Sequence, residues 1–278
     1  MDLARRMKVS ATSDWCRVFP RRLARVLFAA GLSCAVLPAR AAMIDEIQVY
    51  TDDINKPGEF GLELHVNTTP KGRSTPDFPR EITPWHGLRF TPEFSYGLAR
   101  DLEAGLYLPY ARDAEGTTHF AGPKLRLKWL PLRPEKGGQG WFIGANVEYA
   151  WVAPEFEQSN RSIELRPIVG YRGRDWLLAA NPILGWALAG PDHDGKPDFS
   201  PSAKVARNVA SGLALGVEYY AELGKVNNIL PHLEQSHTLY FALDYDRKPW
   251  VFNVGIGRGL NDATDRWTLK TIIGIPLD

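Results

Sequence analysis

The stretch EFGLELHVN, residues 59–67, alternates apolar side chains with polar ones or glycine along its whole length. Successive side chains of a β-strand point to opposite faces of the sheet, so a two-residue period predicts a strand with one apolar and one polar face. A helix would need its apolar residues at a spacing of 3.6 residues. The stretch therefore predicts a β-strand whose two faces meet different surroundings.

The same alternation recurs along the rest of the chain. Most of these runs match the ~9–11 residues that a tilted strand needs to cross a bilayer. The sequence therefore predicts an all-β fold, an antiparallel transmembrane β-barrel of about twelve strands in residues 58–278. The further runs lie at 88–98, 102–110, 120–129, 141–151, 162–171, 176–187, 200–208, 213–222, 238–245, 250–258 and 266–275.

The links between the runs support the same fold. Short links, such as those at 99–101 and 172–174, alternate with long ones, such as those at 68–86 and 188–199. Outer-membrane barrels have short turns on the periplasmic side and longer loops outside. An even number of strands also places both ends of the barrel on the periplasmic side.

Residues 1–41 have the pattern of a cleavable signal peptide. Basic residues up to Arg25 precede the apolar stretch 26–37, and small residues surround Arg40. This order predicts cleavage after Ala41 and export to the bacterial outer membrane. Residues 42–57 would then be a periplasmic N-terminal segment. Both cysteines lie in residues 1–41, so the mature chain has none for a disulfide or a cysteine metal site.

Charge is distributed unevenly along the chain. Residues 1–41 contain eight of the 33 Lys and Arg and two of the 32 Asp and Glu. The remaining 25 basic and 30 acidic residues give residues 42–278 a net charge of −5. Nucleic-acid binding would need a basic face, and nothing in this charge distribution suggests one. The expected partners are instead outer-membrane lipids and the barrel-assembly machinery.

Tryptophan and tyrosine cluster at the ends of the runs, where two aromatic girdles would meet the two membrane interfaces. The alternative is that these rings cap the core of a soluble sandwich. The predicted girdle residues are Tyr96, Tyr110, Trp129, Trp141, Trp151, Tyr171, Trp176, Trp186, Tyr245, Trp250 and Trp267.

Charged residues of both signs occupy the polar faces, which would line the lumen. Lys124, Arg126 and Lys128 share one face of one run, and the neighbouring runs supply acids. Cross-strand neighbours lie within reach of one another, so we expect a charge network that either plugs the lumen or forms a selective constriction. Its predicted members are Glu63, Arg89, Glu93, Glu103, Lys124, Arg126, Lys128, Glu148, Glu164, Arg166, Glu218, Asp244 and Lys270.

Four segments together resemble a family of outer-membrane transporter-type β-barrels often labelled "MetA-pathway of phenol degradation" proteins. They are DEIQVYTDDINKPGEFGLELHVN (45–67), LEAGLYLPY (102–110), GPKLRLKW (122–129) and LGVEYYAELG (215–224). The resemblance implies a narrow channel or transporter for small, often hydrophobic, compounds. It implies no catalytic residues.

Two other functions are compatible with the pattern. An outer-membrane lipid hydrolase would need a serine and a histidine in contact, yet the adjacent Ser236 and His237 would face opposite ways on a strand. A soluble periplasmic barrel that binds a small ligand would show the same alternation. The acids around His193 resemble a solvated turn more than a metal site. We therefore expect no enzyme activity, cofactor or metal.

Overall fold

The predicted runs all coincide with strands. The computed structural model describes residues 46–135, 137–247 and 249–277, so the predicted signal peptide lies outside the described residues. Eighteen strand segments join into the twelve predicted antiparallel strands. They are β1 (Phe60–Lys71), β2 (Leu88–Ala99), β3 (Leu102–Tyr107) with β4 (Tyr110–Arg112), β5 (Thr118–Phe120) with β6 (Lys124–Leu132), β7 (Gly140–Trp151), β8 (Arg161–Arg172), β9 (Trp176–Asn181) with β10 (Leu184–Ala187), β11 (Asp198–Phe199) with β12 (Ser202–Ala210), β13 (Leu213–Glu222) with β14 (Gly224–Lys225), β15 (Asn228–Ile229) with β16 (Ser236–Arg247), β17 (Trp250–Gly259) and β18 (Trp267–Leu277).

Prolines account for several of the interruptions. Pro109 separates β3 from β4, and Pro123 precedes β6. Proline has no N–H to donate to a ladder, but its carbonyl still accepts. The N–H of Ala121 donates to the carbonyl of Pro109 at 2.9 Å, and that of Trp151 donates to the carbonyl of Pro123 at 3.0 Å. Backbone pairing therefore continues across the gaps.

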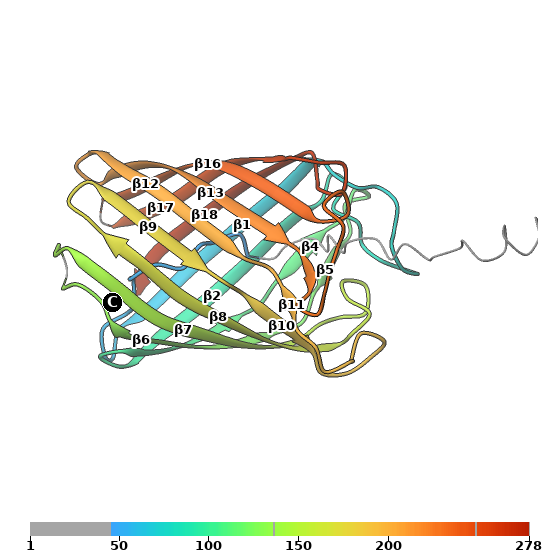
Figure 1. The fold of residues 1–278 in the computed structure, drawn as a ribbon, viewed down its shortest axis with the longest axis horizontal. Helices are drawn as coiled ribbons and strands as arrows, with labels where there is room; N and C mark the ends of the chain where they lie inside the picture. The colour runs from blue at the N-terminus through green and yellow to red at the C-terminus, as the bar shows by residue number, and fades with distance from the viewer. Residues whose placement is uncertain (1–45, 136, 248, 278) are drawn as a thin grey trace, which may run out of the picture. The chain divides into compact units, whose positions relative to one another are not determined.

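The sheet closes on itself. β1 pairs antiparallel with β2 on one side and with β18 on the other, from Phe60 opposite Leu277 to Thr68 opposite Leu269. Figure 1 shows the strands running obliquely around the barrel. Closure pairs the backbone groups that an open sheet edge would expose, which is the condition for a sheet to lie in lipid.

The loops alternate in length as predicted. Links β2–β3, β8–β9 and β12–β13 are tight turns at one end of the barrel. The opposite end carries the long links, including 72–87 between β1 and β2 and 188–197 between β10 and β11. The 72–87 link is ordered by its own contacts, since Arg73 and Glu81 form an ion pair at 2.6 Å.

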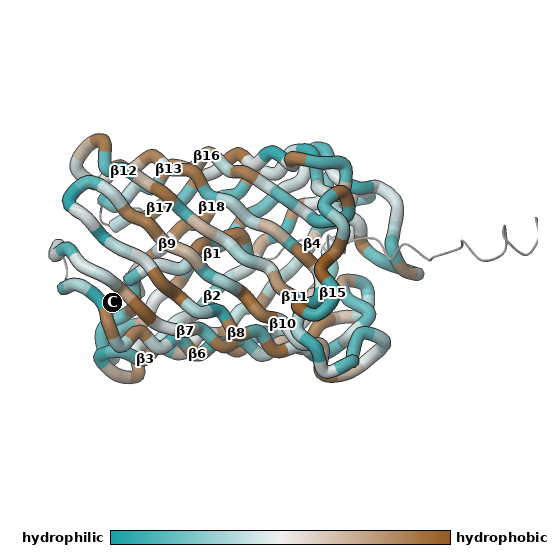
Figure 2. Tube along the Cα trace, viewed as in Figure 1, coloured by the Kyte–Doolittle hydropathy of each residue, from teal (hydrophilic) through white to brown (hydrophobic). Residues whose placement is uncertain are grey.

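The two faces of the wall differ in polarity. On β7, the side chain of Val147 is 38% exposed on the outer face, whereas its neighbour Asn146 is fully buried on the inner face. Figure 2 shows the resulting alternation of hydrophobic and hydrophilic residues along the strands. No helix among the described residues is both long and apolar enough to span a membrane.

The predicted girdle aromatics lie at strand ends on the outer face. Trp141 and Tyr171 pack edge to face at 5.3 Å near the short turns, and Phe90 stacks on Tyr110 at 5.2 Å near the long loops. Arg207 lies 5.4 Å above the ring of Trp176. The most exposed members are Trp129, Trp141, Trp151, Trp176, Trp250 and Trp267, while Tyr96, Tyr110, Tyr171, Trp186 and Tyr245 are partly covered.

Candidate functional site in the barrel lumen

The inner face of the barrel gathers the charged side chains that the sequence assigned to the lumen. Nine of them are buried, which on the polar face of the wall means burial inside the barrel: Arg89, Glu93, Glu103, Arg126, Lys128, Glu148, Arg166, Glu218 and Lys270. The side chains of Glu63, Lys124, Glu164 and Asp244 remain partly exposed. Lys204, which was not among the predicted network residues, is also buried there.

The first charge cluster centres on Arg126 of β6. Its Nη2 atom lies 2.6 Å from a carboxylate oxygen of Glu103 on β3 and 2.8 Å from one of Glu93 on β2. Lys124, two residues earlier on the same face, lies 3.5 Å from Glu148 on β7. The basic strand is therefore flanked by acids on both sides, while Lys128 lies 4.9 Å from the ring of Tyr50.

The second charge cluster takes its residues from β12, β13, β16 and β18. Glu218 of β13 pairs with Lys270 of β18, and its other oxygen lies 3.2 Å from Lys204 of β12. Lys204 also contacts Asp244 of β16 at 2.8 Å. Glu218 and Lys270 are each 1% exposed. Their mutual pairing offsets the cost of burying both charges.

The N-terminal segment 46–57 lies inside the barrel. The sequence assigned it to the periplasm, but its residues Val49 and Tyr50 pack against the inward-facing Leu130 and Phe142. Tyr50 is 2% exposed, and Arg166 lies 4.6 Å above its ring. The described part of this segment is the blue trace among the strands in Figure 1.

Polar contacts hold this segment to the wall along its length. The backbone N–H of Tyr50 donates to Asn181 on β9 at 2.7 Å, and Lys270 donates to the carbonyl of Ile47 at 3.0 Å. The guanidinium of Arg172 makes two hydrogen bonds to Asp52. A segment fixed to several strands by backbone and side-chain bonds is a structural part of the lumen.

Buried side chains surround the N-terminal segment on the inner face of the barrel. The hydroxyl groups of Tyr50 and Tyr107 lie 2.6 Å apart, joining the segment to β3. Side chains with at most 1% exposure come from strands on all sides of the barrel: His65, Thr91, Tyr107, Asn146, Ile168, Asn181, Glu218 and Lys270. The segment and the inward-facing side chains around it are therefore closely packed.

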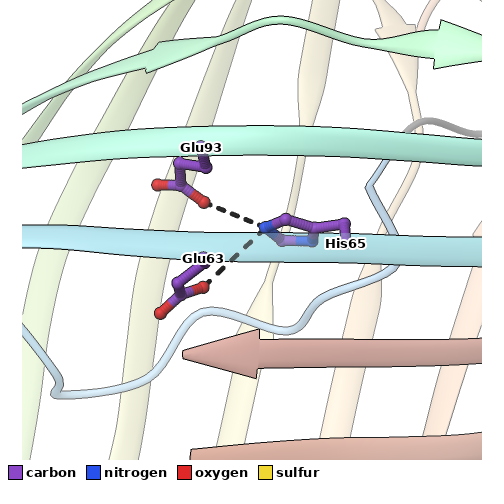
Figure 3. A group of neighbouring side chains, drawn as sticks. All are labelled: Glu63, His65 and Glu93. Carbon is purple, nitrogen blue, oxygen red and sulfur yellow. Dashed lines mark hydrogen bonds and ion pairs between the residues drawn. The ribbon is translucent and has the colours of Figure 1, made fainter. Parts of the chain in front are cut away.

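A histidine and two glutamates meet on the wall between β1 and β2 (Figure 3). The Nε2 atom of His65 lies 3.0 Å from an oxygen of Glu93 and 3.8 Å from an oxygen of Glu63. His65 is fully buried, whereas the side chain of Glu63 is 39% exposed. One donor atom from each residue lies within 4.8 Å of the others, a geometry that suits a metal ion.

The structure does not pair His237, the histidine considered for a hydrolase, with a serine. The ring nitrogens of His237 contact the hydroxyl of Tyr219 at 2.6 Å and the side-chain oxygen of Gln235 at 3.1 Å. His193 contacts the carbonyl of Ala187 at 2.9 Å. Within the described ranges, His237 therefore forms no Ser–His pair, and His193, which the sequence placed in a solvated turn, contacts a loop carbonyl.

The fold is similar to those of solved outer-membrane channels. The COG4313 outer membrane channel from Pseudomonas putida F1 aligns with a TM-score of 0.57 and 13% identity, covering 84% of this chain and 100% of that one. The KdgM porin aligns with a TM-score of 0.54 and 9% identity, covering 78% of this chain and 99% of that one. The NanC porin aligns with a TM-score of 0.51 and 9% identity, covering 79% of this chain and 99% of that one.

At such low identity these likenesses show the fold alone. No protein-family model matches the chain, and no curated protein matches it in sequence. The likeness to solved channels supports the family resemblance drawn from the sequence only as far as the barrel fold. The chain is a closed antiparallel barrel of twelve strands with the fold of outer-membrane channels.

Proposed function

We propose that this protein is a narrow outer-membrane channel for small molecules, closed at rest by its N-terminal segment 46–57. The observation that carries the proposal is the position of Tyr50, buried at 2% exposure among wall residues of a closed barrel. A barrel of about twelve strands encloses more space than its wall side chains fill alone, so a segment in the bore sets its width.

The lining suits small solutes that are not strongly charged. The cations Arg126 and Lys270 are paired with acids, which leaves little net field to select an ion. Tyr50 and Tyr107 meet through their hydroxyl groups, so two aromatic rings lie where the segment touches the wall. Such rings offer apolar contact to the hydrophobic compounds that the family resemblance implies.

Replacing Tyr50 by alanine tests the proposal. The variant should raise the swelling rate of reconstituted liposomes in small neutral solutes, because it removes the ring that packs against Phe142 and contacts Tyr107. Tyr50→Phe keeps the ring and should stay close to the wild-type rate. Equal rates for wild type and Tyr50→Ala, in protein with unchanged heat-modifiable gel mobility, would contradict a gate at this residue.

We also propose that the chain reaches the outer membrane by cleavage of its signal peptide after Ala41, followed by insertion by the assembly machinery among outer-membrane lipids. The basic, apolar and small residues of 1–41 support it. N-terminal sequencing of the exported protein should begin at Ala42. Recovery of an exported chain that retains residues 26–37 would contradict the proposal.

A further inference from the structure

We infer that Glu63, His65 and Glu93 form a binding site for one divalent transition-metal ion, with Zn²⁺ as the best-fitting representative. The site goes beyond the proposed channel function and does not depend on it. The three residues occupy one side of the lumen wall. Glu63 and His65 are two apart on β1 and share a face, and Glu93 lies directly opposite Glu63 on β2.

The spacing of the donor atoms is close to that of a zinc site. Bond lengths of ~2.0–2.1 Å in a tetrahedron place neighbouring ligand atoms ~3.3 Å apart. The observed separations from Nε2 of His65 are 3.0 Å to Glu93 and 3.8 Å to Glu63. The carboxylate oxygens of Glu63 and Glu93 lie within 4.8 Å of each other, so rotations of the two glutamate side chains would bring all three atoms onto one ion.

The charge arrangement calls for a cation between the strands. Two carboxylates directly opposite on adjacent strands repel each other. Arg126 contacts Oε1 of Glu93 and leaves Oε2 facing His65. The basic group that Glu63 contacts is the imidazole of His65, at 3.8 Å. An ion would join Glu63 to Glu93 Oε2 while Arg126 continues to hold the other oxygen.

The ligand types select the class of ion. One imidazole with two carboxylates suits Zn²⁺ and its first-row neighbours, whereas Ca²⁺ and Mg²⁺ prefer oxygen ligands throughout. Three protein ligands leave a coordination position for water, as in exchangeable sites. The partly exposed Glu63 provides the side from which an ion enters.

The surroundings also limit the affinity. Histidine ligands almost always donate their second ring N–H to an acceptor, and losing such a partner costs ~10–100-fold in affinity. Nδ1 of His65 is buried without a hydrogen-bond partner in the described part of the chain. In the metal-free protein Nε2 donates a hydrogen bond to Glu93 at 3.0 Å, so an ion must displace that proton, and binding should be weaker than at a zinc site with a complete second shell.

Calorimetric titration of the tag-free full-length barrel in detergent with ZnCl₂ tests the site. Wild type should bind one Zn²⁺ per chain, and Co²⁺ should give the absorption bands of a low-coordinate N/O site. Glu63→Gln should weaken binding at least ~10–100-fold, since it removes a direct ligand rather than a supporting bond. This change is nearly isosteric and lies at a partly exposed position, so the barrel should still fold.

The matched control is Glu164→Gln, a lumen carboxylate on β8 whose side chain is 30% exposed and pairs with Arg166. It should bind Zn²⁺ as wild type does. Like Glu63→Gln, the single variant His65→Gln should lose Zn²⁺ binding. Its folding is checked by heat-modifiable gel mobility. Absence of Zn²⁺ binding in wild type, or equal affinity in Glu63→Gln and Glu164→Gln, would overturn the site.

Discussion

Replacing Glu218 by leucine is expected to destabilise the barrel by about 3–5 kcal/mol, the cost of leaving a buried charge without its partner. Lys270 is 1% exposed, and Glu218 is the carboxylate with which it pairs. Lys204 is less affected because it keeps its contact with Asp244 at 2.8 Å. Urea unfolding of the protein in lipid vesicles, followed by tryptophan fluorescence, measures the loss.

A second substitution distinguishes a charge effect from a packing effect. The double variant Glu218→Leu, Lys270→Met removes both charges and should recover most of the lost stability, since a buried pair is often replaceable by apolar residues of similar volume. Asp244→Asn, at a side chain that is 30% exposed, should cost much less. A double variant no more stable than Glu218→Leu would show that packing, not the unpaired lysine, is responsible.

Deleting residues 46–53 is expected to produce the largest functional change, an open pore with a severalfold higher conductance and a preference for anions. The deletion removes the side chains of Val49 and Tyr50 from the bore. It also removes Asp52, which pairs with Arg172 on the wall. The unpaired wall cation then faces the water-filled lumen, and fixed charges in a pore select ions of opposite sign.

Planar-bilayer recordings in asymmetric salt measure both effects, as conductance and as reversal potential. Asp52→Asn is the matched control, because it removes one charge but keeps the segment in place. It should shift the reversal potential in the same direction with little change in conductance. A deletion variant that folds and conducts like wild type would show that segment 46–57 does not set the width of the bore.

The barrel itself was predictable from local sequence because strand alternation is a local property. The alternation within each run, such as 59–67, predicts which side chains face lipid and which face the lumen. The run over 176–187, nearly apolar on both faces, still forms β9 and β10. The finer division of strands into segments was not anticipated, although Pro109 and Pro123 mark two of the breaks.

The position of segment 46–57 was not predictable in the same way. Its contacts join residues far apart in sequence, such as Tyr50 and Asn181, separated by 131 positions. Alternation carries no information about such pairs. A usable signal was the acidic and aromatic character of 45–53, DEIQVYTDD, which suits a lumen lined with Lys128 and Arg166. The grouping of His65 with Glu93 likewise depends on the register of β1 with β2.

The pairing of β1 with β18 fixes the order of events during assembly. The bond from Lys270 to the carbonyl of Ile47 spans 223 positions, so it cannot form until nearly the whole chain has been synthesised. Contacts of such high sequence separation make folding slow. Segment 46–57 immediately precedes β1, so the contact of Lys270 with Ile47 and the β1–β18 pairing join the same two ends of the chain. The strand that closes the barrel therefore also holds the N-terminal segment in the lumen.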